Sequence, residues 1–237
     1  DWSSDVCSSD LIHYHGTPIT PRSKLLAMAG KHFCVSFADK RDGDWCLLNA
    51  QSVMWDNGAF SSYTKGKTTD WKGYYEWLES RLSHPHWAVV PDVIDGSVDD
   101  NIKLIKQWPH RKDCSALVWH LDEPIEHLLY LIDLDFGKVC FGSSGKYWQV
   151  GSAAWERRAD SAFNEMTKRG YSPWVHMLRG LAMAGDKYPF ASADSANVAR
   201  HHNEMNMCPE RMARRIDAVQ CPSFWTLRYE QEELFND

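Results

Sequence analysis

Eight short apolar runs recur along this chain of 237 residues and alternate with amphipathic stretches. Each run is brief, is apolar on both faces of an extended strand and contains some β-branched residues, as strands buried on both faces do. We predict strands at residues 12–16, 32–38, 52–57, 87–92, 116–121, 138–143, 174–178 and 190–195. A doubly wound sheet would use the same alternation, but eight consecutive strand–helix units favour closure into a single-domain (β/α)8 TIM barrel.

Helical patterns separate most of these strands. One pattern begins after Asp70 and another after Ser97, and both residue types cap the N-termini of helices. We predict helices at residues 21–29, 71–82, 98–108, 124–132, 153–169, 196–205 and 210–219. Between residues 38 and 52 we expect a loop and no helix.

Charge, cysteine usage and hydropathy limit the classes of function. The net charge of −6 gives no overall basic field, so binding of nucleic acid would need a local basic patch. The seven cysteines form no CxxC pair, which favours reduced thiols and a cytoplasmic location, the host cytoplasm if the gene comes from a phage. No apolar run approaches the roughly 20 residues of a membrane helix, so we expect a soluble protein with no membrane partner.

The two ends of the chain differ in composition from the predicted barrel. Residues 1–11, DWSSDVCSSDL, are rich in Ser and Asp and look like the translation of a sequencing-library adapter. We therefore expect this segment not to be natural protein, and the native start to be missing. The predicted barrel domain spans residues 12–225, and residues 226–237 form an acidic C-terminal tail.

Chemically useful side chains stand at the predicted strand ends, where the active sites of such barrels lie. Three acids and two histidines have this position, and a Gly/Ser turn at 142–145 joins them. Each acid has an ordinary structural explanation as a helix cap or a turn residue, and each histidine as a satisfied core residue. Their convergence on one rim favours a functional site made of Asp56, Asp92, His120, His176 and Asp194.

Four short segments at these strand ends resemble a known family. The segments DNGAFS, VVPDVID, FGSSG and YPFASADS occur in this order, as in the queuine/archaeosine tRNA-guanine transglycosylase superfamily. The resemblance spans residues 12–225 and is strongest to the short phage and bacterial members associated with 7-deazaguanine modification of DNA. It implies a pentosyltransferase that replaces guanine in nucleic acid by a 7-deazaguanine through a covalent aspartyl-sugar intermediate, with DNA favoured over tRNA as the polymer.

The resemblance also implies roles for single residues. Asp194 would be the nucleophile and Asp56 the acid–base group, with His120 near the position of a base-contacting glutamine in the family. This division suits glycosidic bond cleavage, because one carboxylate traps the positive sugar carbon while another moves a proton to the departing base. The predicted substrate-binding residues are Asp92, Asn57, Gly58, Phe60, His120, Gly142, Ser143, Gly145 and His176.

The predicted partners are nucleic acid and a free purine or 7-deazapurine base, with no cofactor. Zinc-bearing family members carry a CxCxxC…H cluster after the nucleophile, whereas this chain has only His201, His202, Cys208 and Cys221 at wide spacing. We therefore expect no zinc subdomain and no bound metal. The residues predicted to contact nucleic acid are Lys65, Lys67, Lys146 and Arg179.

Two other functions fit the same sequence. Metal-dependent amidohydrolases use histidines and an aspartate on this fold to bind zinc and activate water. The corresponding residues here are His13, His15, His120, His176 and Asp194. A non-catalytic paralogue that binds nucleic acid is the second alternative. The sequence leaves open which deazapurine is used, whether the polymer is DNA or tRNA, and the oligomeric state.

Overall fold

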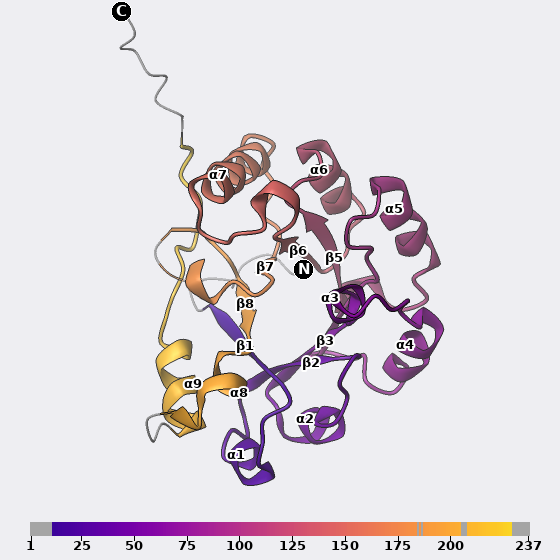
Figure 1. Cartoon of the computed structure of the whole chain (residues 1–237). Coiled ribbons are helices and arrows are strands. Elements are labelled where there is room, and N and C mark those ends of the chain that lie inside the picture. Colours follow the sequence, from indigo (N-terminus) through magenta and orange to yellow (C-terminus); the bar gives the residue numbers. More distant parts are fainter. Residues whose placement is uncertain (1–10, 184, 186, 205–207, 229–237) are drawn as a thin grey trace, which may run out of the picture.

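The computed structural model describes residues 11–183, 185, 187–204 and 208–228. Eight parallel strands pair in sequence order and close into a barrel, with helices around the outside (Figure 1). The strands are β1 (Ile12–Gly16), β2 (His32–Ser36), β3 (Ser52–Asp56), β4 (Trp87–Val89), β5 (Ser115–His120), β6 (Lys138–Gly142), β7 (Val175–Met177) and β8 (Ser192–Ser195). The predicted single-domain (β/α)8 TIM barrel is confirmed.

The helices cover the barrel and include both of the predicted caps. Asp70 accepts a hydrogen bond from the N–H of Gly73 at 2.9 Å, and Ser97 forms a capping box with Asp100. None of the described helices is long and apolar enough to cross a lipid bilayer. The helices are α1 (Arg22–Leu26), α2 (Gly43–Asn49), α3 (Ala59–Thr64), α4 (Trp71–Leu78), α5 (Val98–Gln107), α6 (Ile125–Asp133), α7 (Ala153–Lys168), α8 (Asn197–His201), α9 (Pro209–Asp217) and the short 3-10 turns η1 (Lys112–Cys114), η2 (Gly145–Tyr147) and η3 (Leu181–Met183).

Helix α2 contradicts the loop expected between residues 38 and 52. The segment begins with polar residues, but Gly43 and Cys46 are three positions apart and therefore lie on one side of the helix. Both residues are buried. A side chain at Gly43 would meet Trp77, Val35 and Trp55 at 3.6–3.8 Å, so the helix packs closely there. The predicted adapter-derived segment and acidic tail lie outside the described residues, apart from Leu11 and residues 226–228.

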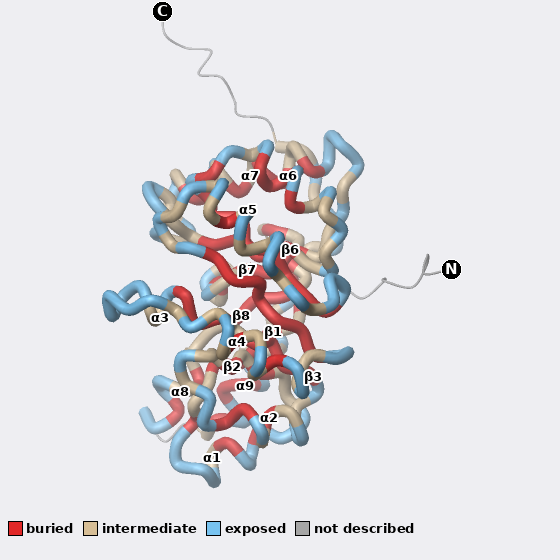
Figure 2. Tube along the Cα trace, turned by 90° about the vertical axis from the view of Figure 1, so that its right-hand side faces the viewer, coloured by how far each residue is buried: buried red, intermediate tan, exposed pale blue. Residues whose placement is uncertain are grey.

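The barrel interior is filled by side chains from alternate strand positions. Tyr14, Met54 and Trp87 belong to one buried cluster inside the barrel, and Figure 2 shows how burial follows the strands. The Tyr14 hydroxyl accepts hydrogen bonds from the Trp87 indole N–H at 2.8 Å and from the Ser52 hydroxyl at 3.1 Å. Neighbouring residues of a strand point to opposite faces. Because Tyr14 points into the barrel, the side chains of His13 and His15 point to its outside.

The carboxyl-terminal ends of the strands form one mouth of the barrel. Helix α3 follows β3 directly and projects from this end (Figure 2). The loops after all eight strands reach the same end because the strands are parallel. The three predicted acids therefore belong to this mouth.

Candidate active site at the carboxyl-terminal mouth

Asp56 is the last residue of β3 and is held by its neighbours. Its carboxylate accepts the backbone N–H of Gly58 at 3.1 Å and a hydrogen bond from the Ser36 hydroxyl. Burial raises the pKa of Asp56 to about 6, and the negative charges of Asp194 and Asp92 add to the rise, against the opposing effect of the two hydrogen bonds. A carboxyl group with this pKa can both accept and donate a proton near neutral pH.

Asp194 lies in β8 and is tied to the end of β7. Its Oδ1 accepts the backbone N–H of Arg179 at 2.7 Å and lies 3.3 Å from Nε2 of His176. The other ring nitrogen of His176 lies 2.8 Å from the Ser192 hydroxyl. The His176 ring also packs against Trp87 with 5.2 Å between ring centres. His176 is therefore inside the barrel, and Asp194 stands above the packed interior.

Asp92 and His120 form a second buried acid–histidine pair. Oδ2 of Asp92 lies 3.0 Å from Nε2 of His120, and Oδ1 accepts a hydrogen bond from the Asn57 amide at 2.7 Å. Burial lowers the pKa of His120, but the hydrogen bond and charge of Asp92 outweigh it, so the pKa lies above its ordinary value. The protonated imidazolium is thus favoured beside this carboxylate.

The structure brings the three predicted acids together. Asp92 and Asp194 both act electrostatically on Asp56, although the three residues come from different parts of the chain. The thiol of Cys140, which is buried in the barrel interior, has its pKa raised first by burial and then by all three carboxylates. The acids therefore surround one region above the packed interior of the barrel.

The Gly/Ser turn after β6 is only partly directed at this region. A side chain at Gly142 would lie 3.3 Å from Nδ1 of His120, so the glycine leaves room for that ring. Gly145 has a φ of +49°, a conformation that suits glycine. Ser143 points away from the carboxylates, because its hydroxyl accepts the indole N–H of Trp155 in α7 at 3.0 Å.

Helix α3 lies over the mouth and is joined to two other loops. Its N-cap residue is Gly58, whose φ of +76° suits glycine. The Arg179 guanidinium carbon lies 4.0 Å from the centre of the Phe60 ring, and the Tyr63 hydroxyl donates a hydrogen bond to Asp95 in the loop after β4. Since β3 and β7 are on opposite sides of an eight-stranded barrel, the Phe60–Arg179 contact spans the mouth.

The lysines predicted to contact nucleic acid are all exposed. Lys65 and Lys67 follow α3, and Lys146 lies in η2 after β6, with its ammonium 5.1 Å from the Tyr147 ring centre. Arg179 is the member of the predicted set that reaches the mouth. Nucleic acid as a partner stays a prediction.

His13 and His15 do not join the other histidines, so the zinc constellation of the amidohydrolase alternative does not assemble. Nε2 of His13 lies 3.0 Å from the Ser195 hydroxyl, and Nε2 of His15 lies 2.9 Å from Oδ1 of Asp217 in α9. Both side chains are outside the barrel because Tyr14 between them points inside. The sequence pattern HxH keeps two side chains on one face but does not say which face.

Glu123 is a buried acid that the sequence pattern did not single out. It accepts the backbone N–H of His120 at 3.0 Å and the Asn101 amide at 3.1 Å, and it lies 3.1 Å from Nδ1 of His127. Burial raises the pKa of Glu123, but the hydrogen bonds and charges of His127 and His120 outweigh it and bring the pKa below its ordinary value. A cavity of about 230 Å³ between the loops after β4, β5 and β6 is lined by Glu123, His120 and Asp95, among others. The position of Glu123 directly before a helix-starting proline was the available signal.

Comparison with known proteins supports the fold only. No protein-family model and no curated protein matches the sequence. A solved structure of the tryptophan synthase α subunit from the hyperthermophile Pyrococcus furiosus has a TM-score of 0.52 at 13% identity, covering 88% of this chain and 96% of that one. A mutant form of that subunit has a TM-score of 0.50 at 12% identity, with the same coverage. At this identity the likeness concerns the barrel architecture and not the chemistry.

These comparisons correct the resemblance drawn from the sequence. The similar structures are tryptophan synthase α subunits, and no sequence match links the chain to guanine transglycosylases. The predicted superfamily, the base-exchange function and the glycosyltransferase class are therefore wrong. The four segments misled because they consist of Asp, Asn, Gly and Ser beside apolar strands, and such residues are common at turns that follow strands.

Proposed function

We propose that this chain is an enzyme that performs general acid–base catalysis on a small polar molecule bound at the carboxyl-terminal mouth of the barrel. The proposal rests on one observation: Asp56 is half-buried beside two other carboxylates, and this environment raises its pKa to about 6. A group that exchanges protons is most effective when its pKa is near the working pH. Clusters of ionisable side chains with shifted pKa values are typical of active sites.

In this proposal Asp194 and Asp92 position the groups around Asp56 and assist its proton transfer. The Arg179 N–H fixes the orientation of the Asp194 carboxylate, and His176 lies on the same oxygen. Asp92 favours the protonated form of His120, which would supply a second donor. Asp56 would then take a proton from the substrate, or return one, between these two fixed acid–histidine pairs.

The side chains at the mouth of the barrel limit which chemical class of substrate can bind. Buried carboxylates need hydrogen-bond donors, so a molecule that presents N–H or O–H groups to Asp56 and Asp194 is favoured over an apolar one. The Arg179 guanidinium at the rim offers a positive charge for an acidic group at the other end of the molecule. We therefore propose a small molecule with donors on one side and an acid on the other.

Proton transfer can be followed even while the substrate is unidentified. The purified protein is incubated in D2O with defined pools of small polar acids, and NMR records substrate loss or replacement of carbon-bound protons by deuterium. We expect one pool to react and Asp56→Asn to react at least about 100-fold more slowly, the usual contribution of an acid–base group. The control variant is Asp99→Asn, an exposed acid in α5.

Two results would overturn the proposal. One is the absence of conversion or exchange in every pool with protein that is shown to be folded. The other is a reacting pool whose rate is the same in the wild type and in Asp56→Asn. A fall in rate in both Asp56→Asn and Asp99→Asn would also count against a specific role for Asp56.

A further inference from the structure

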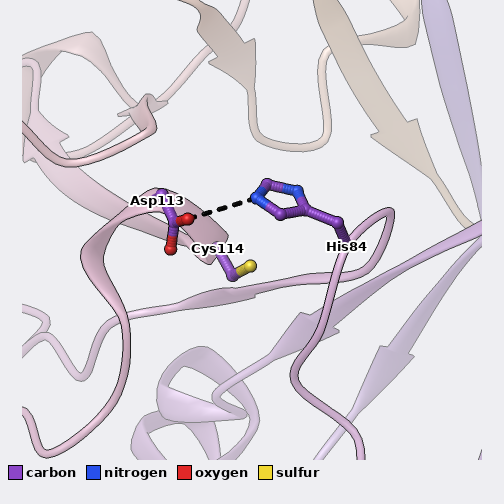
Figure 3. Close-up of side chains that lie close together, drawn as sticks. All are labelled: His84, Asp113 and Cys114. Carbon is purple, nitrogen blue, oxygen red and sulfur yellow. Dashed lines mark hydrogen bonds and ion pairs between the residues drawn. The ribbon is translucent and has the colours of Figure 1, made fainter.

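Three side chains of metal-binding type gather at the amino-terminal end of the barrel. His84 lies in the loop before β4, and Asp113 and Cys114 lie in η1, just before β5 (Figure 3). One nitrogen, one oxygen and one sulfur atom from these residues lie within 4.8 Å of one another. In the part of the chain that the structure describes, no second group of this kind is found. The cluster lies at the end of the barrel opposite to Asp56.

The spacing of one pair of donor atoms, the His84 nitrogen and the Asp113 oxygen, suits a tetrahedral metal ion. Nε2 of His84 lies 3.3 Å from Oδ2 of Asp113. Zinc bonds of about 2.0–2.3 Å in tetrahedral geometry place neighbouring donor atoms roughly 3.2–3.7 Å apart. The His84 side chain is 61% exposed, so it can move the remaining short distance toward the sulfur atom.

The other two ligands are held in place before any ion binds. Arg111 donates hydrogen bonds to both oxygens of Asp113, one of them from Nε at 3.0 Å, and such a partner orients a metal-binding carboxylate. The N–H of Gly137 donates to the Lys112 carbonyl at 2.9 Å and anchors η1. Cys114 follows Asp113 directly and is buried, so its thiol position is fixed by the same turn.

We propose that His84, Asp113 and Cys114 bind one Zn²⁺ ion, with water as the fourth ligand. The mixed nitrogen, oxygen and sulfur set suits zinc or cobalt, and the Cys114 thiolate adds a negative charge to that of Asp113, which Arg111 already pairs. The ion would join the loop before β4 to the turn before β5 on the face of the barrel that serves stability. This site departs from the sequence-based expectation of no metal, because His84 is far from the adjacent pair Asp113 and Cys114 in the chain and the three form no recognisable spacing.

Cobalt gives a direct test, because a cobalt–thiolate bond has its own absorption band. Full-length protein is treated with chelator, titrated with Co²⁺ and then with Zn²⁺, and thermal unfolding is measured with and without Zn²⁺. We expect a thiolate band that saturates at one equivalent and is removed by Zn²⁺, and a higher Tm with Zn²⁺. Cys114→Ser should lose the band and the rise in Tm, and His84→Ala should bind Zn²⁺ at least about tenfold more weakly.

The matched control is Cys208→Ser, a half-buried cysteine at the start of α9. This variant should keep the cobalt band and the rise in Tm. The proposal is overturned if wild-type protein shows no thiolate band, or if the band survives in Cys114→Ser. It is equally overturned if folded His84→Ala, a change at a largely exposed side chain, binds Zn²⁺ as tightly as the wild type.

Discussion

The guanidinium of Arg179 stacks on the ring of Phe60, with 4.0 Å between the guanidinium carbon and the ring centre. The backbone N–H of the same arginine donates to Asp194 at 2.7 Å. Arg179 also has a φ of +54°, which costs a non-glycine residue roughly 1–2 kcal/mol and is kept only where surrounding contacts hold it. A single residue thus connects the helix over the mouth with the carboxylate below it.

Removal of the Phe60 ring should loosen α3. Cation–π contacts at exposed positions contribute about 0.5–1 kcal/mol, so Phe60→Ala should increase opening of α3 about two- to fivefold. Hydrogen–deuterium exchange of the amides in residues 59–64 measures this, with the strand amides unchanged. Phe224→Ala, at a ring that is 73% exposed, is the control. Equal exchange in the Phe60 and Phe224 variants would mean that the stacking does not hold the helix.

Because the pKa of Asp56 is raised, replacement of its carboxyl group should stabilise the folded protein at neutral pH. The pKa is raised from 3.8 in the unfolded chain to about 6, so the folded state resists ionisation. Stability is therefore lost as pH rises from about 4 to about 6, and Asp56→Asn should recover on the order of 1–3 kcal/mol at pH 8. Urea unfolding at pH 4 and pH 8 checks this. A variant no more stable than the wild type at pH 8 would contradict the shifted pKa.

His13 predicts the opposite dependence on pH. Burial, and then the neighbouring His15, lower the pKa of His13 from 6.5 to about 3. The unfolded chain takes up a proton below pH 6.5 and the folded chain does not, so stability falls as pH drops from 6.5 toward 3. His13→Gln should flatten this fall, as measured by unfolding between about pH 7 and pH 4. An unchanged slope would show that His13 is protonated in the folded state.

Substitutions at two glycines of similar backbone conformation distinguish the cost of backbone strain from the cost of steric crowding. Gly58 has a φ of +76°, and a side chain there would lie 3.0 Å from the backbone nitrogen of Ala38. Gly66 has a φ of +61° and nothing within 4 Å. Gly66→Ala should cost about 1 kcal/mol of unfolding free energy, and Gly58→Ala clearly more. Equal losses in urea unfolding would mean that Ala38 moves aside without cost.

Much of the fold was predictable because apolar runs in a parallel barrel are buried on both faces. The first strand has the same bounds in the sequence-based prediction and in the structure, residues 12–16. Helix α2 was missed because its buried side consists of Gly43 and Cys46 among aspartates, and neither residue marks a helix. Short helices of this kind are stabilised by packing on the barrel and not by their own sequence.

The candidate site was predictable in part, for a related reason. Asp56, Asp92 and Asp194 could be placed at one end of the barrel once parallel strands were predicted. The direction of His13 and His15 could not, because both faces of β1 are buried and the pattern does not distinguish inside from outside. Pairing of Asp92 with His120 depends on side-chain positions in three dimensions, which spacing along the chain does not contain.

The packing of Tyr14 and Trp87 across the barrel interior closes any route through the molecule. Whatever binds beside Asp194 would then have to enter and depart at the mouth, where Arg179 is stacked on Phe60. Arrival and release would compete for one passage, so a tightly held product would block the next molecule. The rate of turnover would depend on how often that stacked pair separates.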